Sequence, residues 1–179
     1  MSSRRPKNEE PIEKKIARIL ISQNLSVSAA ESCTGGLVAA TLINAEGISS
    51  VLSETYVTYS NAAKTKLLGV REETLARYGA VSRETAAEMA EGAARAAGAD
   101  IAVATTGIAG PDGGTDQKPV GLVYIGCWYR GKTVVKRCFY GGDRQGIRYA
   151  ACREALEILY CQILTSAIDT KNDGPSFCS

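Results

Sequence analysis

The sequence reads Ser28-Ala29-Ala30-Glu31-Ser32-Cys33-Thr34-Gly35-Gly36 where a run of small residues, Leu25 to Ala30, gives way to an apolar stretch, Leu37 to Ala45. We expect the first run to form a strand and the second a helix, so that a strand, a tight turn and a helix meet at Ser32. Two glycines let the backbone bend sharply and leave room for a ligand. The first amides of a helix have no partner inside it, so they can bind an anion or stabilise an oxyanion. A purely structural turn capped by Thr34 fits the same residues, and the rest of the chain has to decide between the two.

Length and composition narrow the class of protein. The chain has 179 residues, enough for one domain with a substantial core and too few for two full domains. Its net charge is +2 and it holds no long run of like charges, which argues against a nucleic-acid partner. The apolar stretches are shorter than a membrane span, and no apolar signal core follows Met1. We therefore expect a cytoplasmic protein without a membrane or nucleic-acid partner.

The sequence contains no histidine. This excludes Ser-His-Asp and Cys-His catalysis and any histidine metal ligand. If a serine is the nucleophile, its base must be a lysine, a tyrosine or a carboxylate. The six cysteines form no Cys-x-x-Cys pair and show no zinc-ligand spacing, so we predict no metal site and expect most of them to be small core residues.

Around the Ser32 turn, the hydrophobic pattern alternates between helical and strand periods, which is typical of an α/β fold. The expected helices begin near Pro11 and stop at Asn24, then cover Leu37–Ala45, Ala62–Leu68, Arg71–Tyr78, Arg83–Ala97 and about Asp143–Leu164. The expected strands are Leu25–Ala30, Leu52–Tyr59, Asp100–Thr106, Leu122–Tyr129 and Thr133–Tyr140. Residues 1–11 are expected to form a flexible arm and residues 166–179 a disordered tail, which leaves one domain over residues 12–165.

Three polar features accompany these elements. Lys64 falls in the first turn of an expected helix, close to Tyr59, where the helix dipole helps to lower a lysine pKa. A glycine-rich loop over residues 107–121 follows an apolar strand at its carboxyl end, where open α/β sheets bind ligands, although it lacks the Walker and dinucleotide glycine spacings. Arg144 and Arg148 lie one turn apart at the start of the last helix and could together hold a phosphate. Solvated surface roles remain open for the lysine and both arginines, because these residue types are mostly exposed.

Several segments in this order resemble one family: Ala30–Gly36, Val57–Asn61 with Ala63-Lys64, Leu68–Val70, Gly79–Ser82, Thr106–Gly114, Lys118–Gly121 and Gly142–Arg144. They are similar to the C-terminal domain of the CinA family, also known as nicotinamide-nucleotide amidohydrolases. The resemblance covers residues 12 to 164. It implies a single three-layer α/β/α domain with a mixed β-sheet, and a homodimer.

The resemblance also implies a reaction, namely hydrolysis of nicotinamide mononucleotide to nicotinate mononucleotide and ammonia in pyridine nucleotide recycling, without a cofactor. The family's nucleophile, lysine and tyrosine fall on Ser32, Lys64 and Tyr59. Oxyanion donors are expected among the amides of Cys33 to Gly36 or at Gly107, and the phosphate at Arg144 first and Arg148 second. The residues expected to bind substrate are Glu31, Cys33, Thr34, Gly35, Gly36, Thr106, Gly107, Gly110, Gly113, Arg144 and Arg148.

Two other hypotheses stay open at this point. Cys33 could be the nucleophile, because a thiol at a helix N-terminus is acidified, although it has no histidine to pair with. The domain could also be a non-catalytic module that binds a nucleotide or a partner protein. Such a module would bind nucleotide without turnover and would be unaffected by Lys64→Ala.

Overall fold

The fold is built on one five-stranded sheet. The computed structural model describes residues 10–172, so nearly all of the expected N-terminal arm lies outside it. The strand order is β2-β1-β3-β4-β5. The strands are β1 Val27–Glu31, β2 Leu52–Val57, β3 Ile101–Gly107, β4 Leu122–Tyr129 and β5 Lys132–Phe139. β2, β1 and β3 run parallel, whereas β4 pairs antiparallel with both β3 and β5, so the sheet is mixed as expected.

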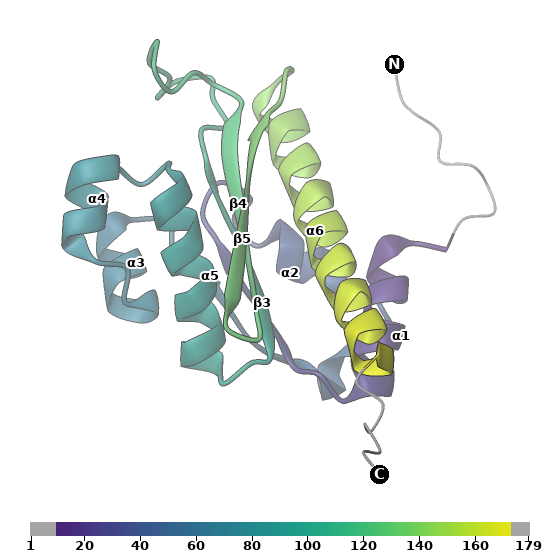
Figure 1. Cartoon of the computed structure of the whole chain (residues 1–179). Coiled ribbons are helices and arrows are strands. Elements are labelled where there is room, and N and C mark those ends of the chain that lie inside the picture. The colour runs from purple at the N-terminus through teal and green to yellow at the C-terminus, as the bar shows by residue number, and fades with distance from the viewer. Residues whose placement is uncertain (1–9, 173–179) are drawn as a thin grey trace.

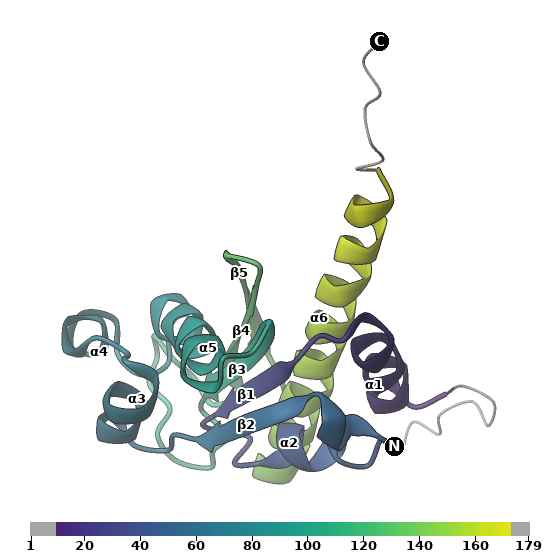
Figure 2. The ribbon, with the colours of Figure 1, turned by 90° about the horizontal axis from the view of Figure 1, so that it is seen from below.

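Helices cover both faces of the sheet (Figures 1 and 2). One face carries α1 Ile12–Gln23, α2 Leu37–Leu42 and α6 Arg144–Asn172. The other face carries α5 Arg83–Ala97, with α3 Asn61–Leu68 and α4 Glu72–Tyr78 packed outside it. A short 3-10 helix, η1 Ile48–Ser50, precedes β2 and contacts α1. Alternate side chains of β3 enter two separate cores, because successive residues of a strand point to opposite faces. The three-layer α/β/α prediction is therefore confirmed.

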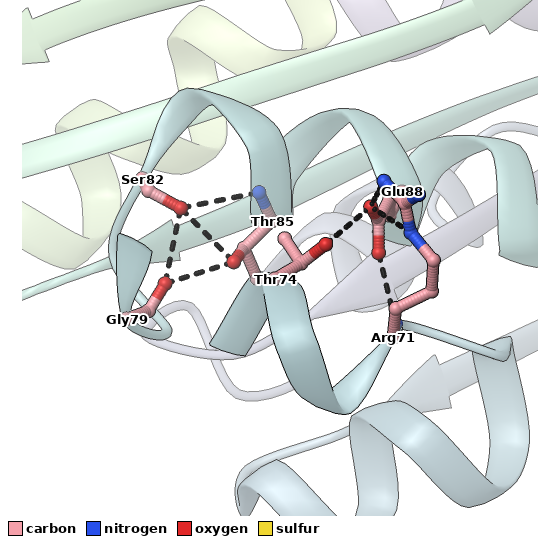
Figure 3. Close-up of polar contacts among 6 residues, drawn as sticks. All are labelled: Arg71, Thr74, Gly79, Ser82, Thr85 and Glu88. Carbon is pink, nitrogen blue, oxygen red and sulfur yellow. Dashed lines mark hydrogen bonds and ion pairs between the residues drawn. The ribbon is translucent and has the colours of Figure 1, made fainter. Parts of the chain in front are cut away.

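Hydrogen bonds tie α4 and the loop that follows it to α5 (Figure 3). The carboxylate of Glu88 in α5 accepts hydrogen bonds from the backbone amide and Nε of Arg71, both at 2.9 Å. At the start of α5, the hydroxyls of Ser82 and Thr85 donate to the carbonyl of Gly79 at 3.0 and 2.8 Å. Ser82 also caps α5, because its side chain accepts a hydrogen bond from the amide of Thr85. These contacts fix a loop that reaches the candidate site described below.

The last helix is longer than the hydrophobic pattern indicated. α6 continues past Leu164 to Asn172, so the tail expected from residue 166 is helical that far, and residues 173–179 lie outside the described part. The physical reason is that neither glycine nor proline occurs between residue 164 and Gly174, so the chain carries no helix-stop signal there. None of the helices within residues 10–172 is long and apolar enough to cross a lipid bilayer.

Candidate active site

The candidate site lies at the carboxyl ends of the parallel strands, the edge where α/β sheets bind ligands. Ser32 directly follows β1, and its amide donates to the carbonyl of Thr105 in the adjacent strand β3 at 3.0 Å. A cleft of about 270 Å³ opens beside it. The cleft is lined by Ser32, Cys33, Tyr59, Lys64, Ala80, Val81, Thr106, Gly107, Ile108, Ala109, Gly110, Asp112, Gly113 and Arg144.

Lys64 is a buried lysine in contact with Ser32. Its side chain projects from the first turn of α3 and the residue is only 1% exposed. Its Nζ lies 3.1 Å from Ser32 Oγ, 2.7 Å from the carbonyl oxygen of Thr58 and 3.5 Å from that of Tyr59. Burial lowers the pKa of Lys64, because desolvation disfavours the ammonium form.

The neighbours of Lys64 also fix the direction of its lone pair. Two of them are carbonyl oxygens, which can only accept hydrogen bonds. A neutral amine has two N–H groups, and these two carbonyls can use both. In the neutral amine, the lone pair is then available to the hydroxyl of Ser32, whose oxygen lies 3.1 Å from Nζ. This is the arrangement that a general base needs in order to take the proton of a serine.

Tyr59 contacts the lysine through its backbone rather than through its ring. The residue is 64% exposed, and its phenolic oxygen accepts a hydrogen bond from Arg144 at 3.1 Å. Arg144 also donates to the carbonyl of Gly110 at 2.7 Å. Arg144 therefore joins the wall of the cleft that carries Tyr59 to the glycine-rich loop on the other side.

Glu31, expected to bind substrate, caps α2 instead. The residue is 1% exposed, and its carboxylate accepts the amides of Gly36, Val38 and Ala39 at 2.9, 3.1 and 2.9 Å. A negative charge at this position compensates the unpaired amides and dipole of the helix N-terminus. The Gly36 amide is therefore occupied and is not an oxyanion donor.

Thr34, the cap considered from the sequence, pairs its hydroxyl with that of Thr105 at 2.7 Å. Within residues 10–172, no oxygen accepts a hydrogen bond from the backbone amides of Cys33, Thr34 and Gly35. The amides of Cys33 and Thr34 lie close to the Cys33 thiol, whose pKa they lower, and all three amides remain candidate oxyanion donors. Among them only Cys33 lines the cleft.

Replacing Glu31 by glutamine is expected to lower the free energy of unfolding by about 1–3 kcal/mol, because a hydrogen bond to a charged group is lost and an amide N–H faces the helix donors. Urea unfolding measures the change, with Glu46→Gln, an exposed glutamate, as the matched control. Equal unfolding midpoints for the Glu31 variant and the native chain would contradict the capping role.

The glycine-rich loop reaches the cleft as expected, although some of its residues serve the fold. Thr106, Gly107, Gly110 and Gly113 all line the cleft. The Thr106 hydroxyl, however, donates to the carbonyl of Ala80 at 2.7 Å. A Cβ at Gly107 would lie 2.6 Å from Val123 Cγ2, so this glycine is required by the close packing of β3 on β4. The end of β3 and the loop that follows it thus form one wall of the cleft.

Sequence reasoning missed several lining residues, namely Ala80, Val81, Ile108, Ala109 and Asp112. All five fall inside segments that carried the family resemblance, so the motif boundaries were a usable signal. Conversely, Glu31, Thr34, Gly35, Gly36 and Arg148 were expected to bind substrate and do not line the cleft.

Cys33 lacks the properties of a reactive cysteine. It is 6% exposed, and burial raises the pKa of its thiol to about 12, more than the adjacent backbone amides lower it. The thiolate is therefore scarce at neutral pH, and the acidification expected from the sequence is wrong.

We expect Cys33→Ala to keep the rate of any reaction at this site within about threefold, a change of less than about 1 kcal/mol in the barrier. The same turnover assay measures the variant beside the native chain, with and without iodoacetamide. Rapid alkylation of Cys33 together with loss of turnover would instead establish a cysteine enzyme.

Comparisons with known proteins agree on one family. Residues 9–163 match the CinA C-terminal domain. A CinA-like protein of Kosmotoga olearia is 53% identical over 151 residues, which is 84% of this chain and 37% of the relative. The chain thus spans little more than a third of the curated relatives it matches.

Solved structures similar to this chain belong to the same family. The competence/damage inducible protein CihA from Agrobacterium tumefaciens is 45% identical with a TM-score of 0.79, covering 87% of this chain and 98% of that one. A CinA superfamily protein from Klebsiella pneumoniae 700603 is 38% identical with a TM-score of 0.82, covering 86% of this chain and 96% of that one. The chain that places Ser32 against a buried lysine therefore belongs to the CinA C-terminal domain family.

Proposed function

We propose that this domain is an amidohydrolase that converts nicotinamide mononucleotide to nicotinate mononucleotide and ammonia, with Ser32 as nucleophile and Lys64 as base. The observation that carries the proposal is the 3.1 Å contact between Ser32 Oγ and Lys64 Nζ, inside a cleft and with the lysine buried. Because the chain has no histidine, the base of a serine nucleophile must be a lysine, a tyrosine or a carboxylate, and Lys64 is the one of these in contact with Ser32 Oγ.

The chemistry follows from the two side chains. Neutral Lys64 takes the proton of Ser32 as Oγ forms a bond to the carboxamide carbon, which produces a tetrahedral oxyanion. The amides of the Ser32 turn, first that of Cys33, stabilise this oxyanion, and one such donor contributes about 3–4 kcal/mol. The Lys64 ammonium then protonates the departing nitrogen and the C–N bond breaks. Ammonia is released, and the acyl group stays bonded to Ser32 Oγ as an ester. Water attacks this ester with Lys64 again as base, which releases the carboxylate and restores the hydroxyl.

The position of Arg144 favours a nucleotide as the substrate. Its guanidinium lines the same cleft as Ser32 and can pair with the phosphate of the mononucleotide. Tyr59, which Arg144 holds in place, forms the wall against which the ring can pack. The substrate amide then points toward Ser32 and its phosphate toward the start of α6.

The deciding experiment measures ammonia release from nicotinamide mononucleotide with a chelator present and no added metal. The proposal expects release by the native chain and its loss in Ser32→Ala and Lys64→Ala. A folded native chain that binds the nucleotide by calorimetry and releases no ammonia would support the binding module and exclude the amidohydrolase.

Arg144→Gln is expected to raise the KM for nicotinamide mononucleotide about 10- to 100-fold, since a charge-assisted phosphate contact is worth about 1.5–3 kcal/mol. Nicotinamide riboside, which lacks the phosphate, provides the internal control. Any change in the loop that Arg144 also holds affects both substrates, so the ratio of their kcat/KM values isolates the phosphate contact. An unchanged ratio would contradict the assignment.

A further inference from the structure

Arg148 reaches the backbone of the Ser32 turn from the other end of the sequence. It lies one turn beyond Arg144 on α6 and is half-buried. Its Nε donates to the carbonyl of Cys33 at 3.2 Å, and its NH2 group donates to the carbonyl of Thr34 at 2.7 Å. One guanidinium thus holds the two consecutive carbonyls that follow Ser32, without lining the cleft.

Holding these carbonyls orients the amides of the turn. A peptide group is planar and its C=O and N–H point in opposite directions. The amides of Thr34 and Gly35 are therefore directed away from Arg148. They belong to the set of amides to which the described chain offers no oxygen acceptor.

The turn needs such an external support. Gly35 and Gly36 have φ values of 60° and 98°, and glycine permits many alternative conformations. The Ser32 amide bonds to Thr105 and the Gly36 amide to Glu31, so the two ends of the turn are anchored. Between them, the Thr34 hydroxyl pairs with Thr105 and the Thr34 carbonyl also accepts the Leu37 amide at 3.4 Å. Arg148 is the side chain that bonds to both consecutive carbonyls, those of Cys33 and Thr34.

We propose that Arg148 is a positioning residue for the nucleophile. It touches neither substrate nor reacting atoms, but it holds the turn so that Ser32 Oγ faces Lys64 and the free amides keep their directions. The inference rests on the proposed role of Ser32 as nucleophile. It also replaces the phosphate role expected for Arg148, because Arg148 bonds to the turn and does not line the cleft, whereas Arg144 does.

The primary test compares Arg148→Ala with the native chain in the ammonia assay. A displaced nucleophile lowers kcat by about 100-fold, because a shift of about 1 Å has that effect, whereas KM stays within about threefold. Millimolar methylguanidinium is expected to restore part of the lost kcat by occupying the vacated space. The pH profile of the remaining activity keeps its midpoint, since Lys64 is untouched. Arg153→Ala, an exposed arginine on the same helix paired with Glu157, is the matched control.

A second variant and a second readout keep the test decisive. Arg148→Lys retains a charge but cannot span two carbonyls, so it is expected to lose about tenfold in kcat while remaining folded. The rate at which Ser32 Oγ displaces fluoride from a small fluorophosphonate, followed by mass spectrometry, reports nucleophile alignment without nicotinamide mononucleotide. Slower labelling in both variants supports the inference even if the native chain releases no ammonia. Native labelling rates in both variants, or a rise in KM that matches the fall in kcat, would overturn it.

Discussion

Ser32→Ala is expected to lower the rate of ammonia release by about 10⁴- to 10⁶-fold, the loss seen when a nucleophile that acts with its base is removed. The residual rate comes from substrate binding and the oxyanion donors alone. No second group takes over, because the adjacent thiol of Cys33 is buried with its pKa raised to about 12.

Binding of nicotinamide mononucleotide by Ser32→Ala distinguishes loss of the nucleophile from misfolding of the variant. The hydroxyl of Ser32 takes part mainly in the transition state, so the dissociation constant for nicotinamide mononucleotide is expected to stay within about threefold. Calorimetric titration and thermal unfolding of the variant measure this, with Ser50→Ala, an exposed serine, as control. More than a tenth of the native rate in a folded Ser32→Ala protein would rule Ser32 out as nucleophile.

Lys64→Met is expected to lower the same rate by about 10³- to 10⁵-fold and at the same time to stabilise the fold. Methionine has a similar length and no charge to desolvate, so the desolvation cost that lowers the pKa of Lys64 disappears in the variant. Loss of activity with a gain in stability separates a functional lysine from a structural one. Urea unfolding at pH 7 measures the gain. A variant less stable than the native chain would contradict this account of the lysine.

The pH dependence follows from the lowered pKa of Lys64. Between the folded pKa and the ordinary value of 10.5, the unfolded chain binds more protons than the native one, so native stability rises with pH across this window. The stability advantage of Lys64→Met is therefore largest below the folded pKa and shrinks toward pH 10.5. Native turnover rises with pH through the folded pKa, because only the neutral amine is a base.

Lys66→Met provides the matched control for both effects. Lys66 is exposed and lies two residues further along α3. We expect its substitution to change neither turnover nor the pH dependence of unfolding. The comparison removes any general effect of losing one positive charge from the helix.

Local features of the sequence predicted most of the secondary structure. The hydroxyls of Ser60 and Ser82 cap α3 and α5, and such caps are a local signal because they involve residues only three apart. The strand-turn-helix around Ser32 was also predictable, since two glycines and a change of hydrophobic period mark it. The lack of histidine excludes whole classes of catalysis by composition alone, since no packing can supply an imidazole that the chain does not contain.

The chemistry of individual side chains, in contrast, was decided by tertiary packing. Glu31 was expected to contact substrate, but its burial against α2 makes it a helix cap. Lys64 becomes a candidate base because the fold removes it from water and brings it to Ser32, 32 residues away in the sequence. Arg148 meets Cys33 across 115 residues. The periodicity and capping residues of the sequence indicate which helices and strands form. The burial and the charge environment of a side chain arise only when distant elements pack together. That environment determines whether Lys64 can act as a base and whether Arg148 can hold the turn.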